Sequence, residues 1–155
     1  MTKNSVLTGN NNYLEDFEPG LVIRHTRGKT VGELENVLVT NLVMNTADGH
    51  FNEHLMQSSP IGERIVFGGA TASLAIGLTM QDTGENALQE LSMTGMRLKF
   101  PVKHGDTIYA FSEVLSVEDS DRLDAGIVEF QHWGVNQDDR VVFECERRVL
   151  IRKRP

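Results

Sequence analysis

Two stretches of this sequence could carry chemistry: a polar loop with one histidine and a glycine-rich step that follows it. The loop covers residues 45–52 and contains His50, and the step covers residues 62–69 and ends in Gly68 and Gly69. A helix that begins at these glycines leaves its first backbone N–H groups free, so the order predicts a titratable side chain near unpaired donors. This combination suits acyl chemistry, in which a proton moves while negative charge develops on a carbonyl oxygen.

Two predicted helices lead into and away from these stretches. Residues 69–80 are small or apolar almost all round, which is typical of a helix buried on most of its surface. Upstream, Thr30 and Glu33 have the spacing of a capping box, and apolar residues then recur at helical spacing as far as Leu42. The pattern predicts a helix of about three turns that begins near Val31 and delivers the chain to the polar loop.

Strand patterns dominate the second half of the sequence. A first strand is predicted over residues 21–27, and four long strands are predicted over residues 91–100, 106–117, 126–134 and 140–152. In the last of these, one set of alternate positions is largely apolar and the other is mostly charged. Polar turns separate the strands, so the sequence predicts an α+β fold with a curved antiparallel sheet around the buried helix.

Several motifs resemble those of the MaoC-like (R)-specific enoyl-CoA hydratase family. That family has an Asp-x-Asn-Pro-x-His loop followed by a Val-x-Gly step, and residues 45–50 and 66–68 are similar to these two motifs. Further similarities, some of them to the mesaconyl-CoA hydratase branch, lie at Pro101, residues 105–107, 126–128, 136–138 and 147–148. The resemblance implies a hotdog fold, with one domain over residues 13–155 after a flexible tail of residues 1–12.

The resemblance also implies roles for three residues of the loop. His50 is expected to be the general acid and base, since a histidine exchanges protons near neutral pH. The family has an aspartate where this chain has Asn45, and an asparagine can position a water molecule but cannot take its proton. Asp48 is the neighbouring carboxylate: it either compensates for this change or serves only as a turn residue before Gly49.

Substrate contacts are expected from the glycine-rich step and from two arginines. Gly68 matches the family glycine whose N–H polarises the thioester carbonyl, and Gly69 would add a second donor. Close packing of the helix is the alternative reason for both glycines. Arg64 and Arg97 are candidates for binding a phosphate of coenzyme A or a carboxylate of the substrate, because arginine recognises both groups with paired hydrogen bonds.

Composition narrows the class of protein and its partners. The formal net charge of −7 argues against general binding of nucleic acid, and no apolar run approaches the ~20 residues of a membrane span. A single cysteine, Cys145, cannot form an internal disulfide, which fits the cytoplasm. The remaining histidines have no spacing typical of a metal site, and coenzyme A would enter as part of the substrate, so we expect no metal and no separate cofactor.

The predicted function is that of a hydratase or dehydratase acting on an enoyl-CoA thioester, with a branched or dicarboxylic acyl-CoA such as mesaconyl-CoA as the candidate substrate. A hotdog thioesterase is one alternative, but residues 69–80 contain no acidic side chain to activate a hydrolytic water. A catalytically silent acyl-CoA-binding protein is the other alternative, and Asn45 is the residue that supports it. We also expect a homodimer, because one curved sheet around one helix leaves an open edge.

Overall fold

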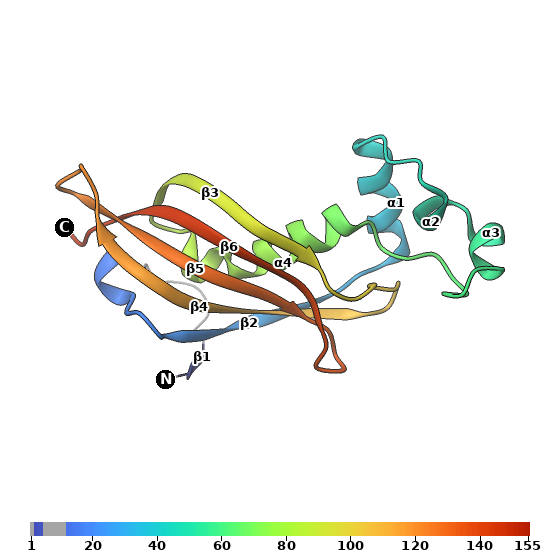
Figure 1. Ribbon diagram of the computed structural model, residues 1–155, viewed down its shortest axis with the longest axis horizontal. Coiled ribbons are helices and arrows are strands. Elements are labelled where there is room, and N and C mark those ends of the chain that lie inside the picture. The colour runs from blue at the N-terminus through green and yellow to red at the C-terminus, as the bar shows by residue number, and fades with distance from the viewer. Residues whose placement is uncertain (1, 5–11) are drawn as a thin grey trace.

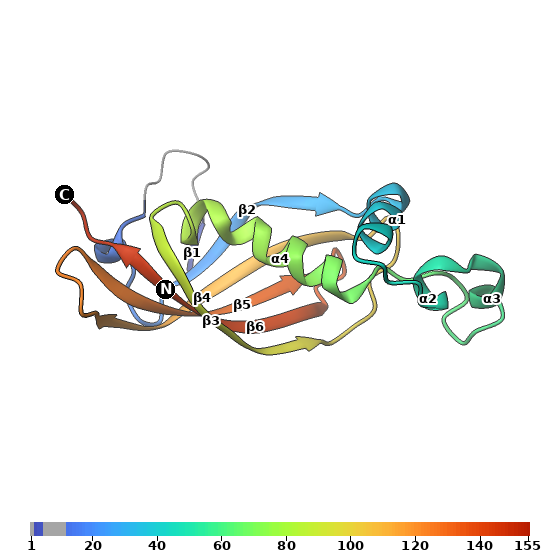
Figure 2. The ribbon, with the colours of Figure 1, turned by 90° about the horizontal axis from the view of Figure 1, so that it is seen from above.

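The protein is described here by a computed structural model that covers residues 2–4 and 12–155. One sheet with the strand order β1-β2-β4-β5-β6-β3 curves around the long helix α4 (Figures 1 and 2). The strands are β1 (Thr2–Asn4), β2 (Val22–Thr30), β3 (Ala87–Leu98), β4 (Thr107–Asp119), β5 (Ala125–Val135) and β6 (Val141–Arg152). The helices are the 3-10 turn η1 (Leu14–Asp16), α1 (Glu33–Leu42), α2 (Asp48–Phe51), α3 (Glu53–Gln57) and α4 (Gly68–Thr83).

The sheet is antiparallel between all five long strands, and only the short β1 runs parallel to its neighbour β2. Shifts of register interrupt the pairing of β2 with β4, of β3 with β6 and of β4 with β5. Such irregularities bend strands, and they let the sheet wrap the helix. The predicted α+β fold with a curved antiparallel sheet around a central helix is therefore confirmed.

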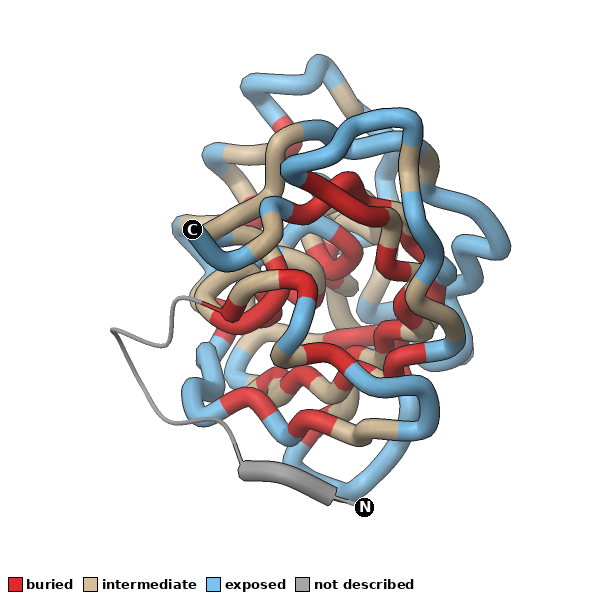
Figure 3. Tube along the Cα trace, turned by 90° about the vertical axis from the view of Figure 1, so that its left-hand side faces the viewer, coloured by how far each residue is buried: buried red, intermediate tan, exposed pale blue. Residues whose placement is uncertain are grey.

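Small side chains allow α4 to lie close to the sheet. Ala75 is 1% exposed, and a Cβ placed on Gly134 of β5 would come within 3.0 Å of its methyl group. A larger residue at either position would push the helix away from the strands. In the tube of Figure 3 the buried segments gather in the interior and the exposed segments form the outer turns.

Two apolar clusters cover the inner face of the sheet, one packed against α4 and the other against Leu14 and Phe17 at η1, and a polar layer lies between them. One cluster includes Val66, Ala75 and Phe143, and the other includes Val114 and Phe130. Between them the strands present buried polar residues to the helix: His25, Ser112, His132 and Arg147. The alternation predicted for β6 holds at Phe143, Cys145, Arg147, Val149 and Ile151, which are buried, whereas the predicted outward residues Val142 and Leu150 are buried as well.

Three local predictions need correction. The helix α1 begins at Glu33, not near Val31, and the predicted cap Thr30 belongs to β2, where its hydroxyl contacts that of Thr107 at 2.7 Å. Gly32 takes the cap position instead, and its N–H donates to Glu35. The central helix, predicted over residues 69–80, continues to Thr83, so α4 does include an acidic residue, Asp82.

The expected tail of residues 1–12 differs from the structure where the structure describes it. Residues 2–4 form β1, and Asn12 is 9% exposed and donates its amide to the Asp82 carbonyl at 2.9 Å. Residue 1 and residues 5–11 lie outside the described part of the chain. Among the described residues, no helix combines the length and the apolar character that a membrane crossing would need.

Candidate active site

A short segment, residues 65–67, runs beside the histidine loop and leads into α4. Its backbone is held from three sides: Ile65 N donates to Gly49 O at 3.0 Å, Val66 N donates to Val102 O at 2.8 Å, and Phe67 N donates to Asn36 Oδ1 at 2.9 Å. We call residues 65–67 the strap. Because its polar groups are paired with different elements, the strap fixes the distance between the loop and the helix.

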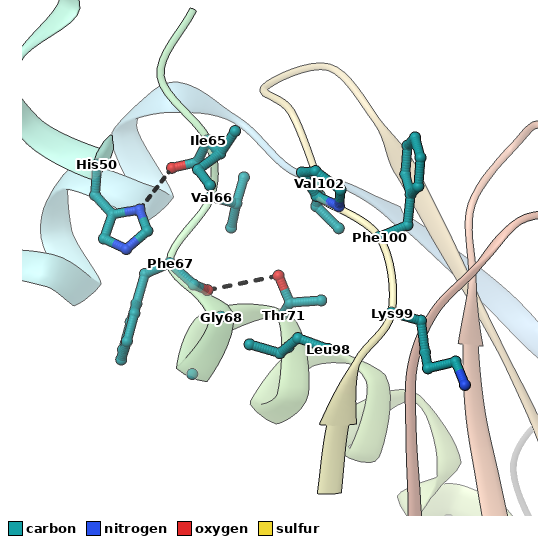
Figure 4. A pocket seen from close by; sticks show the side chains of 12 residues that line it. His50, Ile65, Val66, Phe67, Gly68, Thr71, Leu98, Lys99, Phe100 and Val102 are labelled. Carbon is teal, nitrogen blue, oxygen red and sulfur yellow. Dashed lines mark hydrogen bonds between the residues drawn. The ribbon is translucent and has the colours of Figure 1, made fainter. Parts of the chain in front are cut away.

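His50 lies on α2 and is half-buried beside the strap. Its Nδ1 is 2.9 Å from the Ile65 carbonyl oxygen, which can only accept, so Nδ1 carries the proton and donates it (Figure 4). In the neutral ring, Nε2 then holds a lone pair that can take a proton. The edge of the ring also meets Phe67, with centroids 5.7 Å apart. The two contacts fix both the tautomer and the orientation of the imidazole.

The first turn of α4 presents backbone donors next to this histidine. Its cap residue is Phe67, and within residues 12–155 no side-chain cap hydrogen bond satisfies the first turn. Thr71 N donates to Phe67 O at 3.0 Å, so the intrahelical bonds begin there and the amides of Gly68 and Gly69 precede them. The partial positive charge of the helix end adds to these donors, which makes this turn a suitable place for a developing anion.

A cleft of about 420 Å³ brings His50 and these glycines together. Its walls are mainly apolar, and they come from the loop, the strap, the first turn of α4 and the connection after β3. The residues that line it are His50, Ile65, Val66, Phe67, Gly68, Gly69, Thr71 and 98–102. Figure 4 shows the His50 ring on one side of Phe67 and the Leu98 side chain close to Gly68 on the other side. A methyl group on Gly68 would collide with the end of the Leu98 side chain, so this side chain, which is 60% exposed, would have to move within the cleft.

The structure does not place Asn45 and Asp48 among the residues that line the cleft. Asn45 Oδ1 accepts the N–H of Ala47 at 3.2 Å, which forms a turn just before α2. Asp48 is exposed in the first turn of α2, and Asn52 Nδ2 lies 3.4 Å from its Oδ1. It precedes His50 by two positions, so the two side chains point from different faces of the helix.

The two candidate arginines also lie outside the cleft lining. Arg64 is 13% exposed, donates Nε to Glu53 at 2.9 Å and pairs with Glu33 through Nη2. These carboxylates, Glu53 first, raise the pKa of Arg64, so its charge is used to join the strap region to α1 and α3. Arg97 on β3 is 70% exposed and 3.4 Å from Glu144. Their binding of substrate stays a prediction.

Comparison of the sequence with known proteins shows the family to which the chain belongs. The sequence model described as mesaconyl-CoA hydratase matches residues 7–153. The chain belongs to the mesaconyl-CoA hydratase family. It is 41% identical over 108 residues to a β-methylmalyl-CoA dehydratase of Chloroflexus aurantiacus, across 70% of this chain and 30% of that protein. It is 30% identical over 167 residues to a mesaconyl-CoA hydratase of Haloarcula marismortui, across 99% of this chain and 45% of that protein.

A solved structure extends the comparison to the fold. A MaoC domain protein dehydratase from Chloroflexus aurantiacus superposes with a TM-score of 0.87 at 32% identity, over 95% of this chain and 46% of that chain. The likeness confirms the predicted hotdog fold. In all three comparisons this member of the mesaconyl-CoA hydratase family spans less than half of the length of its relative.

Residues that the sequence did not single out complete the site of this family member. Asn36 of α1 binds the strap, and Leu98 and Thr71 contribute walls of the cleft. The signal for Asn36 was weak: it is one polar residue in a helix whose pattern was read for its apolar positions. Leu98 ends an expected strand, and only the three-dimensional approach of β3 to the start of α4 gives it a role.

A second group of polar residues lies near the opposite end of α4, inside the polar layer. His25 Nδ1 is 2.6 Å from Asp82 Oδ2 and its Nε2 is 2.7 Å from Ser112 Oγ. Ser112 Oγ is also 2.6 Å from Nδ1 of His132, which is 1% exposed and stacks on Phe130. Burial, with the charge of Arg147 as a smaller cause, lowers the pKa of His132 well below its usual range.

Proposed function

We propose that this chain is a hydratase or dehydratase that acts on an enoyl-CoA thioester, with His50 as the proton-transfer group. One observation carries the proposal: His50, whose Nδ1 is bonded to the Ile65 carbonyl, lines the same cleft as Gly68 and Gly69 of the first turn of α4. Hydration of an enoyl thioester needs a base near the reacting water and donors near the carbonyl oxygen. The family membership supports the same chemistry.

In the proposed reaction, His50 Nε2 takes a proton from a water molecule as its oxygen forms a bond to C3 of the acyl group. The C2–C3 double bond breaks, and its electrons move onto the thioester oxygen, where the N–H groups of Gly68 and Gly69 stabilise the enolate. The imidazolium then returns a proton to C2, so one water has been added in total. Removal of water follows the same steps in reverse, and neither direction requires a metal or a separate cofactor.

We propose a branched or dicarboxylic acyl group such as the mesaconyl group as substrate. The support comes from the relatives, which are named for mesaconyl-CoA and β-methylmalyl-CoA. Within this proposal Asn45 acts through the turn that it forms with Ala47, and from there it orients α2, which carries His50. The position of Asp48 supports a role at the start of α2 more than a role in proton transfer.

We propose that the active protein contains two hotdog units, here as a homodimer. Among the described strands β3 pairs only with β6, which leaves its other edge open. Exposed apolar side chains gather on and after this edge strand: Leu91, Met93, Met96, Leu98 and Phe100. An open apolar edge is suited to pairing with another copy. The greater length of the relatives supports an assembly of two such units.

We place the protein in the cytoplasm. Cys145 is a free and buried thiol, which fits a reducing compartment, and coenzyme A thioesters are the proposed substrates.

Sedimentation of the purified chain at micromolar concentration tests the assembly, and a monomer at all concentrations would contradict the proposed dimer.

Two parallel assays test the proposed reaction. Purified protein is incubated with crotonyl-CoA and with mesaconyl-CoA, and the absorbance of the conjugated thioester and the release of free thiol are followed together. Hydration lowers the absorbance without release of thiol, whereas a thioesterase would release thiol. If the folded protein neither lowers the absorbance nor releases thiol with either substrate, an acyl-CoA-binding protein is the better interpretation.

A further inference from the structure

Asn36 connects three elements around the site through a single buried amide. Its side chain is 1% exposed; Oδ1 accepts from Phe67 N at 2.9 Å, and Nδ2 is 3.1 Å from Nε2 of His104. Phe67 N can only donate, so the amide oxygen must face it and the NH₂ group must face His104. His104 then accepts through Nε2, and its ring holds the asparagine in this orientation.

The bond to Phe67 differs from the other bonds of the strap. Ile65 and Val66 are tied through their N–H groups to backbone carbonyls, which persist whatever the side chains are. The Phe67 N–H depends on one side chain, and Phe67 is the residue from which α4 starts. The direction of the next peptide groups, those of Gly68 and Gly69, is therefore set in part by Asn36.

We propose that Asn36 is a positioning residue for the reaction and that His104 keeps its amide correctly oriented. The inference rests on the proposed function. Asn36 does not line the active cleft, but it lines a neighbouring groove beside α1, and so it acts through the strap. Without its oxygen, the Phe67 N–H loses its partner and the donors for the enolate lose their alignment. That alignment matters in the transition state, so the loss should appear in kcat.

Three variants test this role. Asn36→Leu has a similar shape but no acceptor, and we expect kcat to fall by about ten- to a hundredfold with KM within about twofold. Asn36→Asp keeps an oxygen for the Phe67 N–H, and His104 can donate to the second oxygen once its proton is on Nε2, so kcat should recover to within about fivefold of the wild type. Asn41→Leu is the matched control on the same helix, because Asn41 is exposed and bonds only to Val37 O at 2.8 Å among the described residues.

Hydrogen exchange of single amides separates this inference from the proposed function. In Asn36→Leu the Phe67 amide should exchange at least about tenfold faster than in the wild type, while the Val66 amide, bonded to Val102 O, stays protected. If Asn36→Leu does not fold, Asn36→Ser replaces it, since a serine can bond to its own helix and cannot reach the strap.

The outcomes are distinct. A wild type without activity on any enoyl-CoA contradicts the proposed function, and the exchange of Phe67 then still reports whether Asn36 holds the strap. An active wild type whose Asn36→Leu variant keeps full kcat, or an unchanged exchange rate at Phe67, overturns the inference. A fall in kcat that Asn36→Asp does not recover would also overturn it, because the acceptor would then not be the cause.

Discussion

The two ends of α4 use similar residues for opposite purposes. At the N-terminal end, His50 has one ring nitrogen bonded to the strap, and its cleft also holds the first amides of the helix. At the C-terminal end, His25 has both ring nitrogens bonded, and Asp82 and Ser112, its partners, are 4% and 0% exposed. The reactivity proposed for His50 therefore depends on an available lone pair in a cleft, and the presence of a histidine beside a carboxylate is insufficient.

The closed end illustrates how burial removes a polar group from chemistry. Asp82, His25 and Ser112 stand in the order of a nucleophilic triad, with contacts of 2.6 Å and 2.7 Å. Yet the serine hydroxyl has a single proton to share between His25 and His132, and its side chain is fully buried. Because a substrate cannot reach it, we assign this layer to the stability of the core.

The largest expected effect is at the open end. His50→Ala should lower enoyl-CoA hydration by at least about a hundredfold, because the group that exchanges protons with water and C2 is lost. The melting transition should change little, since His50 is only half-buried. His54→Ala is the control, as His54 is exposed on α3. Full activity of a folded His50→Ala protein would remove this residue from the mechanism.

Next in size is the effect of the first glycine of α4. Gly68→Ala should lower kcat/KM by about tenfold or more, since the new methyl group collides with Leu98 in the cleft. Adding Leu98→Ala to this variant should restore part of the loss, because it gives the methyl group room. Gly77→Ala is the matched control: Gly77 is on the exposed side of α4 with open space around it, and the substitution should stabilise the helix by about 0.5–1 kcal/mol. Equal activities of all four proteins would contradict the assigned role of Gly68.

Asn45 should have a smaller effect, which depends on the substrate. Asn45→Ala loses the turn to Ala47 and should reduce kcat by about tenfold with little change in KM. Asn45→Asp keeps an acceptor for that turn but adds a negative charge near the site, so it should impair mesaconyl-CoA more than crotonyl-CoA. Kinetics of the wild type and both variants with the two substrates decide this, and a gain with mesaconyl-CoA in Asn45→Asp would contradict it.

The smallest effect concerns the closed end and is seen only in stability. The folded pKa of His132 is lower than the unfolded value of about 6.5, so the unfolded chain binds more protons as the pH falls. The stabilisation that comes from keeping the His132 ring neutral is fully present above pH ~6.5. Below that pH, the free energy of unfolding falls by up to about 1.4 kcal/mol per pH unit. Denaturant unfolding of wild type and His132→Gln between pH 7.5 and 5.5 measures this, and the variant should depend less on pH. An identical dependence in both proteins would refute it.

Local sequence patterns predicted the elements that form the frame of the site better than the long-range contacts that hold these elements in place. The glycine-rich step and the histidine loop were expected close together, and both line one cleft because Ile65 pairs with Gly49 of the loop just before α4 begins. The central helix and the four long strands were found within a few residues, since burial and alternation act locally.

The contacts that support this frame join residues distant in the chain. Asn36 binds Phe67 across 31 positions and Ser112 binds His132 across 20, and no periodicity in the sequence marks such pairs. Thr30 had the right spacing for a cap, but its backbone is part of the pairing between β2 and β4, so it cannot begin the helix. The burial of Asp82 depends on His25, which lies 57 positions before it.

The single thiol of this protein has a chemical consequence. Cys145 is 1% exposed on β6, and burial raises its pKa to about 11. At neutral pH only about one thiol in ten thousand is then ionised, and the thiolate is the form that reacts with peroxides and disulfides. The folded chain should therefore resist oxidation. It should also resist forming a mixed disulfide with free coenzyme A, even where that thiol is present together with the proposed substrates.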